Sequence, residues 1–526
     1  MDIMLLTEIN VGFWAILPPI IAIVLALITK EVVSSLLVGI VSGALIYAIA
    51  LGGGFGEVVM GTITTTFEAM NANINFFIII FLSMLGALVI LVGKSGGAIA
   101  YGKWATKKIK TRRTSLLSTI ILGILIFIDD YFNCLTIGTV MKPVTDKYQV
   151  SHAKLAYVID STAAPVCIIA PISSWAAAVG SALLIADPSV EPLVAFIKTI
   201  PYNLYAILTL IMVFVVAGFS FDFGKMKQVE ENAIKTNDLG DVQQNEEIEI
   251  GGKKNGHVYD MILPVIALII FAIFAMLWTG GFFTKGSEGY LNLFQAFGGC
   301  DSSLSLVIAG FLALIFTFLL YIPRKIVSFG DFMSSIVEGA KTMINADVIL
   351  ILAWTISAIC GSEFLNTGAY VVGLVQKSNM TLTILPAIIF IVAAFLSFSM
   401  GTAWGTFTIL IPIVVPIFKA DAPALLAMAL GATLAGSVFG DHCSPISDTT
   451  ILSSTGSGCN HIQHVQTQIP YCLCVAGCCF IGYLVGGLCN GNVFATLGSG
   501  LLSLVLLFVF IKFLLPKINE KRNANK

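Results

Sequence analysis

The sequence predicts an all-α polytopic membrane protein of about 12–13 transmembrane segments, in two inverted-topology repeats with broken or re-entrant helices. Three observations support this: a high apolar content, short matches that recur in order in the two halves, and acid-bearing interruptions of apolar runs. Of the 526 residues, 57% are hydrophobic and 11% are charged, and the mean hydropathy is +0.95. Soluble proteins carry about 25% charged residues, so this chain cannot cover itself with solvated groups.

Apolar runs of roughly twenty residues, the length that crosses a bilayer core, recur along the whole chain. We expect spans in the first half near 11–29, 31–50, 74–93, 114–128, 152–186 and 192–220. In the second half we expect them near 260–280, 301–322, 346–365, 383–398, 423–440, 466–489 and 492–515.

The stretch between the halves is acidic and poor in apolar residues, which predicts a solvated linker. The expected organisation is a first membrane repeat (1–221), a cytoplasmic acidic linker (222–258), a second membrane repeat (259–490), and an additional transmembrane helix with a cytoplasmic tail (491–526).

Composition excludes several other classes of protein. The formal net charge of −2 lacks the basic footprint of a nucleic-acid-binding protein. Most of the 11 cysteines lie inside apolar segments without a pair of Cys-x-x-Cys knuckles, so they indicate helix packing rather than a structural metal. No His-Glu-x-x-His, Gly-x-Ser-x-Gly or phosphate-cradling motif is present, and we expect neither an enzyme nor a resident cofactor.

Short matches between the halves predict an internal duplication. Glu68 and Asn75 match residues that lie 270 positions later, and further pairs follow in order with slowly drifting offsets. The clearest is Pro171-Ile172-Ser173, which matches Pro445-Ile446-Ser447 at an offset of 274. Single matches arise easily by chance in apolar sequence, but an ordered series of them favours duplication.

Loop charge predicts that the two halves insert in opposite orientations. The loop 94–113 carries seven Lys and Arg residues, whereas its counterpart, about 366–382, carries only Lys377. The positive-inside rule places the first loop in the cytoplasm and the second outside. It also predicts an external N-terminus and a cytoplasmic C-terminus. Inverted repeats are common in ion-coupled transporters, whose sites lie near the midplane.

Four segments interrupt the apolar pattern, near 129–139, 160–174, 397–408 and 440–450, and they form two repeat-related pairs. Each combines Pro or Gly with oxygen-bearing side chains. Broken helices expose carbonyl groups where they line a cavity, and such oxygens suit a small hard cation. The candidate ion- or substrate-binding residues are Asp129, Asp130, Asn133, Thr136, Asp160, Ser161, Thr162, Ser173, Thr402, Thr406, Asp441, His442, Ser444, Ser447, Asp448 and Thr449.

Ionised carboxylates within these apolar spans raise the free energy of the folded protein in the membrane. An ionised Asp at the centre of a transmembrane helix costs roughly 2.5–3.5 kcal/mol, so these groups must be paired, protonated or solvated in a cavity. The adjacent pair Asp129-Asp130 resists double ionisation. Carboxylates that hold either a proton or Na⁺ are what an exchanger requires, and we expect Asp160, Asp441 and Asp448 as the Na⁺ ligands.

Plainer roles stay open for the same residues. Asp129 or Asp130 is also a suitable cap for the helix that follows. Asp160 also fits a structural hydrogen bond, and His442 is as well suited to bonding a carbonyl as to carrying protons. About half of the hydroxyl residues in these segments are expected to serve ordinary helix packing.

The motif from Gly440 to Thr450 (GDHCSPISDTT), together with 129–133 (DDYFN) and 160–165 (DSTAAP), resembles the NhaC-type sodium/proton antiporter family. The resemblance implies residence in a bacterial inner membrane and membership of a larger superfamily of ion transporters. Proteins of that superfamily have inverted repeats with re-entrant or broken helices, and several are dimers with an elevator-like motion.

The resemblance and the residues together favour exchange of Na⁺ for H⁺ by alternating access. The expected partners are membrane lipid, these two coupling ions and a second copy of the chain. The alternative is Na⁺- or H⁺-coupled transport of a small organic solute, because the family also includes malate/lactate exchangers and amino-acid carriers. The interruptions contain no cluster of Arg residues, which mildly disfavours a dicarboxylate.

Overall fold

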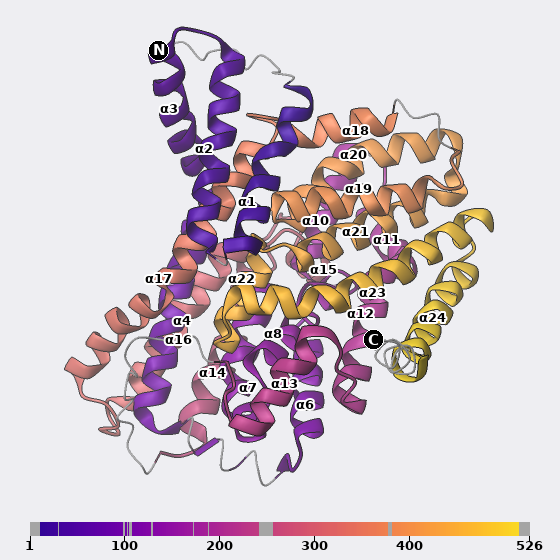
Figure 1. Cartoon of the computed structure of the whole chain (residues 1–526). Coiled ribbons are helices and arrows are strands. Elements are labelled where there is room, and N and C mark those ends of the chain that lie inside the picture. The colour runs from indigo at the N-terminus through magenta and orange to yellow at the C-terminus, as the bar shows by residue number, and fades with distance from the viewer. Residues whose placement is uncertain are drawn as a thin grey trace, which may run out of the picture.

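The computed structural model describes residues 11–29, 31–97, 100–101, 104, 108–127, 130–171, 173–187, 189–240, 256–376 and 381–514. Within these residues every regular secondary-structure element is a helix, which confirms the all-α prediction (Figure 1). Asp129, the N-terminus and much of the acidic stretch after residue 240 lie outside the described residues.

The first half contains η1 (Gly12–Ile16), α1 (Leu17–Thr29), α2 (Val32–Leu51), α3 (Phe55–Asn73), α4 (Phe76–Ser95), α6 (Arg112–Leu125), α7 (Asp130–Lys147), α8 (His152–Asp160), α9 (Ala164–Cys167), α10 (Ser174–Ala186), α11 (Pro192–Thr199), η2 (Ile200–Tyr202) and α12 (Leu204–Phe219). The helix α13 (Gly224–Thr236) follows them.

The second half contains α14 (Tyr259–Thr279), α15 (Leu293–Gly298), α16 (Ser302–Tyr321), α17 (Phe329–Cys360), α18 (Thr367–Gln376), α19 (Leu385–Met400), α20 (Ala403–Asp421), η3 (Pro423–Leu425), α21 (Leu426–Cys443), α22 (Asp448–Ser457) and α23 (His461–Leu488). The described part ends with α24 (Val493–Val509) and a short π-helix, η4 (Phe510–Leu514).

Eight helices of the described part are long and apolar enough to cross a membrane, and a ninth candidate is the bent α17. That helix turns by 46° between Phe329–Ile344 and Asp347–Cys360. Three shorter apolar helices, including those on both sides of Gly401, supply further membrane-embedded segments. The chain is therefore a multi-pass membrane protein with broken helices.

The helix boundaries repeat along the chain. Helices α2 and α16 begin at residues 32 and 302, an offset of 270, and α6 and α19 begin at 112 and 385, an offset of 273. Helices α7 and α20 begin at 130 and 403, also 273 apart, and α10 and α22 begin at 174 and 448, an offset of 274. This regularity supports internal duplication, while the opposite orientation of the halves stays a prediction.

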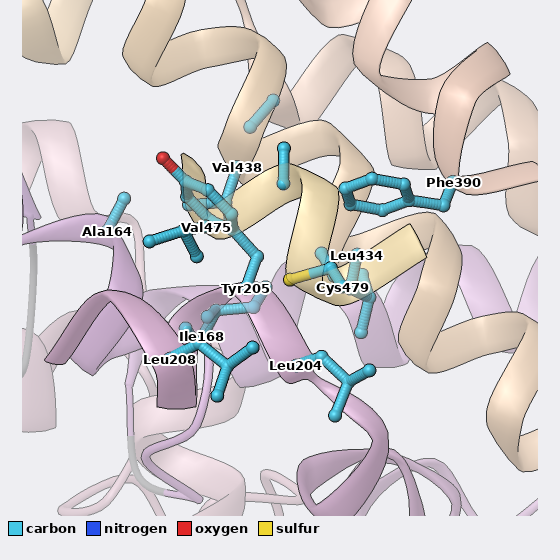
Figure 2. Close-up of a cluster of buried hydrophobic side chains, with 14 of the residues drawn as sticks. Ala164, Ile168, Leu204, Tyr205, Leu208, Phe390, Leu434, Val438, Val475 and Cys479 are labelled. Carbon is cyan, nitrogen blue, oxygen red and sulfur yellow. The ribbon is translucent and has the colours of Figure 1, made fainter. Parts of the chain in front are cut away.

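Two hydrophobic cores hold the helices together. The first contains residues of α6, α8–α12, α19–α21, α23 and α24, and the second contains residues of α1–α4, α7, α14, α16, α17 and α22. Figure 2 shows part of the first core, where Tyr205 of α12 lies beside Val438 and Val475. Helix α8 contributes to both cores, with Val158 in the first and Ile159 in the second. The end of α8 is therefore placed between them.

Two expected segments differ from the structure. The single span expected over 152–186 is three helices, α8, α9 and α10, because Pro165 and Pro171 cannot donate backbone hydrogen bonds within a continuous helix. The expected solvated linker begins with the ordered helix α13, whose Met226 and Ala233 are fully buried. Helix α13 packs against α8 and α23, so this part of the linker is packed onto the membrane domain.

Candidate functional site

The break between α21 and α22 forms one wall of the candidate site. It spans Ser444-Pro445-Ile446-Ser447, where Ser444 is extended, as the residue before a proline prefers. The hydroxyl of Ser447 then caps α22 by accepting a hydrogen bond from the backbone N–H of Thr450 at 3.3 Å. Helix α22 therefore starts at Asp448, directly after an unwound segment inside the protein.

The break between α19 and α20 lies against this first break. Gly401 has a φ of +68°, and a Cβ there would lie 2.5 Å from the carbonyl oxygen of Ile446. Only glycine allows this conformation and this approach without strain. The hydroxyl of Ser444 donates to the carbonyl oxygen of Phe398 at 2.8 Å and joins the two breaks.

Carboxylates and hydroxyls gather beside the first break, in a set that we name the Asp441 group: Asp441, Asp448, Thr449, Ser447 and Tyr131. Thr449 connects the two acids, because its hydroxyl donates to Asp441 Oδ2 at 2.7 Å and its backbone N–H donates to Asp448 Oδ1 at 2.8 Å. The Ser447 hydroxyl lies 3.1 Å from that of Thr449. The Tyr131 hydroxyl, from α7, donates to Asp448 Oδ2.

A second set, which we name the Asp160 group, contains Asp160, Gln468, His464, His442 and Thr450. Oδ2 of Asp160 accepts from Gln468 Nε2 at 2.6 Å and lies 3.3 Å from His464 Nε2 and 3.4 Å from the Thr450 hydroxyl. His442 Nε2 is 3.8 Å from Asp160 Oδ1. Asp160 is fully buried, so these contacts replace its hydration.

The ends and faces of three helices determine the positions of the side chains in the Asp160 group. Helix α8 ends at Asp160, and α23 presents His464 and Gln468 one turn apart on the same face. Tyr205 contacts the His442 ring, with its hydroxyl 3.2 Å from Nδ1 of the histidine. The ring of Tyr205 lies in the first core (Figure 2). Residues from both halves of the chain therefore meet at one carboxylate.

Several acceptors of the two groups lack a hydrogen-bond partner among the described residues. They are Asp160 Oδ1, Asp441 Oδ1 and Gln468 Oε1, all on buried side chains. No Lys or Arg in the described part forms an ion pair with Asp160, Asp441 or Asp448. A buried acceptor without a donor is costly, and a bound cation or proton removes that cost.

The described residues contain no group of three or more His, Cys, Asp or Glu side chains that is suited to holding a metal ion. A Na⁺ site does not require such a group, because carbonyl and hydroxyl oxygens are adequate ligands for a hard cation. The assignment of Asp160, Asp441 and Asp448 as Na⁺ ligands stays a prediction.

The structure places several predicted residues in local backbone contacts rather than in the two groups. Asn133 donates to the carbonyl oxygens of Gly123, Ile126 and Thr162 at 2.7–3.2 Å, and so joins the end of α6 to the end of α8. The Thr162 hydroxyl donates to the Val158 carbonyl oxygen at 2.8 Å.

Three further hydroxyls serve helix starts. Ser173 caps α10 through the N–H of Ala176 at 3.1 Å, and Thr402 caps α20 through Gly405 at 3.4 Å. Thr406 donates to the Thr402 carbonyl oxygen at 2.9 Å. Asp130 and Thr136 lie in α7 and Ser161 lies at the end of α8, and all three are buried.

Sequence reasoning missed His464, Gln468, Thr450 and Tyr131. The polar run from His461 to Gln468 was placed mostly outside the expected span 466–489, yet α23 begins at His461. The available signal was the i, i+4 spacing of His464 and Gln468 at the head of an apolar run, which puts both on one helix face. Tyr131 and Thr450 lie inside the interruptions but are not among the candidate residues named from the sequence.

Comparison with known proteins identifies relatives of this chain. The model of the Na⁺/H⁺ antiporter family matches residues 189–488, more than half of the chain. An uncharacterized protein of Haemophilus influenzae is 40% identical over 516 residues, which cover 97% of this chain and 98% of that protein. The malate-2H⁺/Na⁺-lactate antiporter of Bacillus subtilis is 27% identical over 167 residues, 30% of this chain and 34% of its own length.

Two solved structures share weak overall similarity. Neisseria gonorrhoeae MtrF, described as illuminating a class of antimetabolite efflux pumps, has a TM-score of 0.35 at 12% identity, over 92% of this chain and 95% of its own. The Alcanivorax borkumensis YdaH transporter has a TM-score of 0.33 at 13% identity, over 88% and 90%. Scores this low do not establish a shared fold.

Proposed function

Because the chain belongs to the Na⁺/H⁺ antiporter family, we propose that this transporter exchanges Na⁺ for H⁺ across a bacterial inner membrane by alternating access. The observation that carries the proposal is the pairing of Asp441 and Asp448 through Thr449. Two buried carboxylates share one bridging residue, and no described Lys or Arg neutralises them. A site of this charge and oxygen content favours a small cation over an anion.

Competition for the same carboxylates supplies the coupling. Neighbouring carboxylates resist simultaneous ionisation, so either a proton or Na⁺ lowers the free energy of the buried pair. The Asp441 group provides carboxylate and hydroxyl oxygens for Na⁺. A carrier with neither ion keeps uncompensated charge inside the membrane and rarely reorients, so outward movement of one ion requires inward movement of the other.

The test uses purified protein in liposomes with an internal pH dye. Na⁺ added alone is expected to start a proton flux that Asp441→Asn abolishes. Asp146→Asn is the matched control, because Asp146 is partly exposed near the end of α7 and pairs with His152 at 3.0 Å. A wild-type protein that moves no protons in response to Na⁺ would overturn the proposal.

A second candidate is coupled transport of a small organic acid, which the similarity to the malate-2H⁺/Na⁺-lactate antiporter favours. Helix N-termini at breaks bind anions elsewhere. Here Ser173, Thr402 and Ser447 each already accept a hydrogen bond from the N–H of the third residue of α10, α20 and α22. Adding malate and lactate at fixed Na⁺ in the same liposomes separates the two candidates, since only the second requires the acid for flux.

The membrane topology follows from the same proposal. The two repeats have opposite orientations. The N-terminus lies outside, whereas the loop 94–113 and the C-terminus lie in the cytoplasm. The assembled state is a homodimer. Labelling of single cysteines with an impermeant thiol reagent tests this orientation. Lys108→Cys is expected to stay unlabelled in intact cells, and Lys285→Cys, in the loop after α14, is expected to react.

A further inference from the structure

We propose that Gln468 is a positioning residue that couples the two carboxylate groups of the site. Its side-chain amide holds Asp160 against the last turn of α21, which contains Asp441. This inference rests on the proposed function, since the coupled process is the exchange of Na⁺ for H⁺.

The amide of Gln468 makes two short hydrogen bonds. Nε2 donates to Asp160 Oδ2 at 2.6 Å and to the backbone carbonyl oxygen of His442 at 2.8 Å. The opposite orientation of the amide would set its oxygen against two acceptors, so the hydrogen-bonding pattern fixes which end is the donor. Both N–H groups are used, and the side chain is fully buried.

These two bonds join three helices from both halves of the chain. Gln468 lies on α23, Asp160 ends α8, and His442 is the residue after Asp441 near the end of α21. The Thr450 hydroxyl also connects Asp160 to the end of α21, but over longer distances. It lies 3.4 Å from Asp160 Oδ2 and 3.5 Å from the Asp441 carbonyl oxygen. Gln468 therefore makes the shortest of the described connections between Asp160 and the Asp441 segment, since His442 Nε2 is 3.8 Å from Asp160 Oδ1.

The connection transmits displacement. Binding of an ion at Asp441 changes the geometry at the end of α21, because that helix ends at Cys443 and the unwound segment 444–447 follows it directly. When the His442 carbonyl oxygen moves, the Gln468 amide that is hydrogen-bonded to it moves as well. Asp160, bonded to the same amide, then shifts with it. His464, one turn before Gln468 on the same face, lies against the same carboxylate oxygen and moves with α23.

Two substitutions remove the connection in different ways. Gln468→Asn keeps the amide but shortens its reach by one methylene, so it cannot bond both acceptors. Gln468→Glu keeps the reach but, when ionised, offers no donor. The matched control is Thr467→Ala, because Thr467 is equally buried on α23 and its hydroxyl bonds only carbonyl oxygens of its own helix, Gln463 and His464, at 2.9 Å.

Parallel measurement of proton flux and radioactive Na⁺ flux in liposomes tests the role. Both Gln468 variants are expected to raise the KM for Na⁺ about tenfold or more, as expected for loss of one hydrogen bond to a charged group. They are also expected to lower the ratio of protons to Na⁺ moved, while the maximal Na⁺ rate changes less. Thr467→Ala is expected to keep both quantities within twofold of wild type.

Gln468 variants that keep the KM and the flux ratio within twofold would overturn the inference, as would a fall in maximal rate alone, which indicates a merely structural role. Gln468→Met, similar in volume, is measured by the same criteria if neither polar variant folds. Wild-type protein without Na⁺-driven proton flux rejects the proposed function and the coupling role together. Wild-type exchange with unaltered variants rejects the coupling role alone.

Discussion

At the scale of single residues, Thr449 has the most direct contact with both acids of the Asp441 group. Its hydroxyl serves Asp441 and its backbone N–H serves Asp448. Loss of the hydroxyl leaves Asp441 Oδ2 without that donor while the backbone bond stays. We therefore expect the side chain to affect the affinity of the candidate site without being needed for the helix.

Thr449→Val is nearly isosteric and is expected to change the KM for Na⁺ about tenfold, which corresponds to about 1.4 kcal/mol for one lost hydrogen bond to a charged group. The control is Thr455→Val on the same helix, because the Thr455 hydroxyl bonds only the Ile451 carbonyl oxygen at 2.8 Å. Initial rates of Na⁺-driven proton flux in liposomes give both values. Equal KM values for the two variants would remove Thr449 from the site.

Residue types predicted the helix breaks but not which hydroxyls lie beside the acids. Pro, Gly and Asp within apolar runs identified the breaks, because few structural roles explain them there. Ser173 and Ser447 follow the same Pro-Ile-Ser pattern and both cap a helix, yet only Ser447 also lies beside Thr449 and the acids. Local sequence does not contain that difference, since it depends on which helices pack together.

At the scale of helices, α7 and α22 cross closely enough to bring Tyr131 to Asp448. A Cβ at Gly138 of α7 would lie 2.3 Å from the carbonyl carbon of Gly456 in α22. Such a contact cannot be relieved by a side-chain rotation, because both partners are backbone. The short crossing therefore depends on glycine at this position.

Gly138→Ala is expected to separate the two helices and to destabilise the protein by about 1–3 kcal/mol, the usual range for overpacking. It is also expected to lower transport by moving Tyr131 away from Asp448. Gly477→Ala on α23 is the control, because no described atom lies within 4 Å of a Cβ there. Thermal unfolding in detergent and transport rates are measured together. A stable, fully active Gly138→Ala protein would show that the crossing is looser than described.

Helix α13 is anchored to the helix that carries Asp160. Glu230 is buried, and its carboxylate accepts from the Arg112 guanidinium and from the backbone N–H of Ser151 at 2.9 Å. Ser151 is the N-cap of α8. The first turn of α8 is therefore held by a segment that composition alone predicted to be solvated.

Glu230→Gln is expected to lower the free energy of unfolding by about 1–3 kcal/mol, because it weakens two hydrogen bonds to a buried carboxylate. Glu231→Gln is the matched control, since Glu231 is 49% exposed and pairs loosely with lysines on its own helix. Thermal unfolding of the purified proteins gives the comparison. Equal destabilisation by both substitutions would argue that α13 does not anchor α8.

Composition missed α13 because its partners are distant in the chain. Met226 and Ala233 are seven residues apart on one face, too few apolar positions to identify a buried helix in an acidic stretch. Burial of Glu230 depends on Arg112, 118 residues earlier. Only the assembled fold brings that pair together.

At the scale of the whole molecule, the site lies between two hydrophobic cores and is built from both halves of the chain. Asp160 comes from the first half, and Asp441, Asp448 and Gln468 come from the second. An internal duplication stays a prediction from recurrent matches at offsets near 270, and the helix starts, which follow similar offsets, support it. The meeting of α8 with α23 was not predictable, since it depends on how the repeats interlock.

The central claim is that Na⁺ and protons compete for the buried carboxylates around Asp441 and Asp160. The most direct measurement is proton release when Na⁺ is added to the purified protein in weakly buffered detergent solution with a pH dye, against choline as the control cation. The account predicts that Na⁺, but not choline, releases protons, and that Asp441→Asn greatly reduces the release. Binding of Na⁺, seen as thermal stabilisation, without proton release at any pH would contradict it.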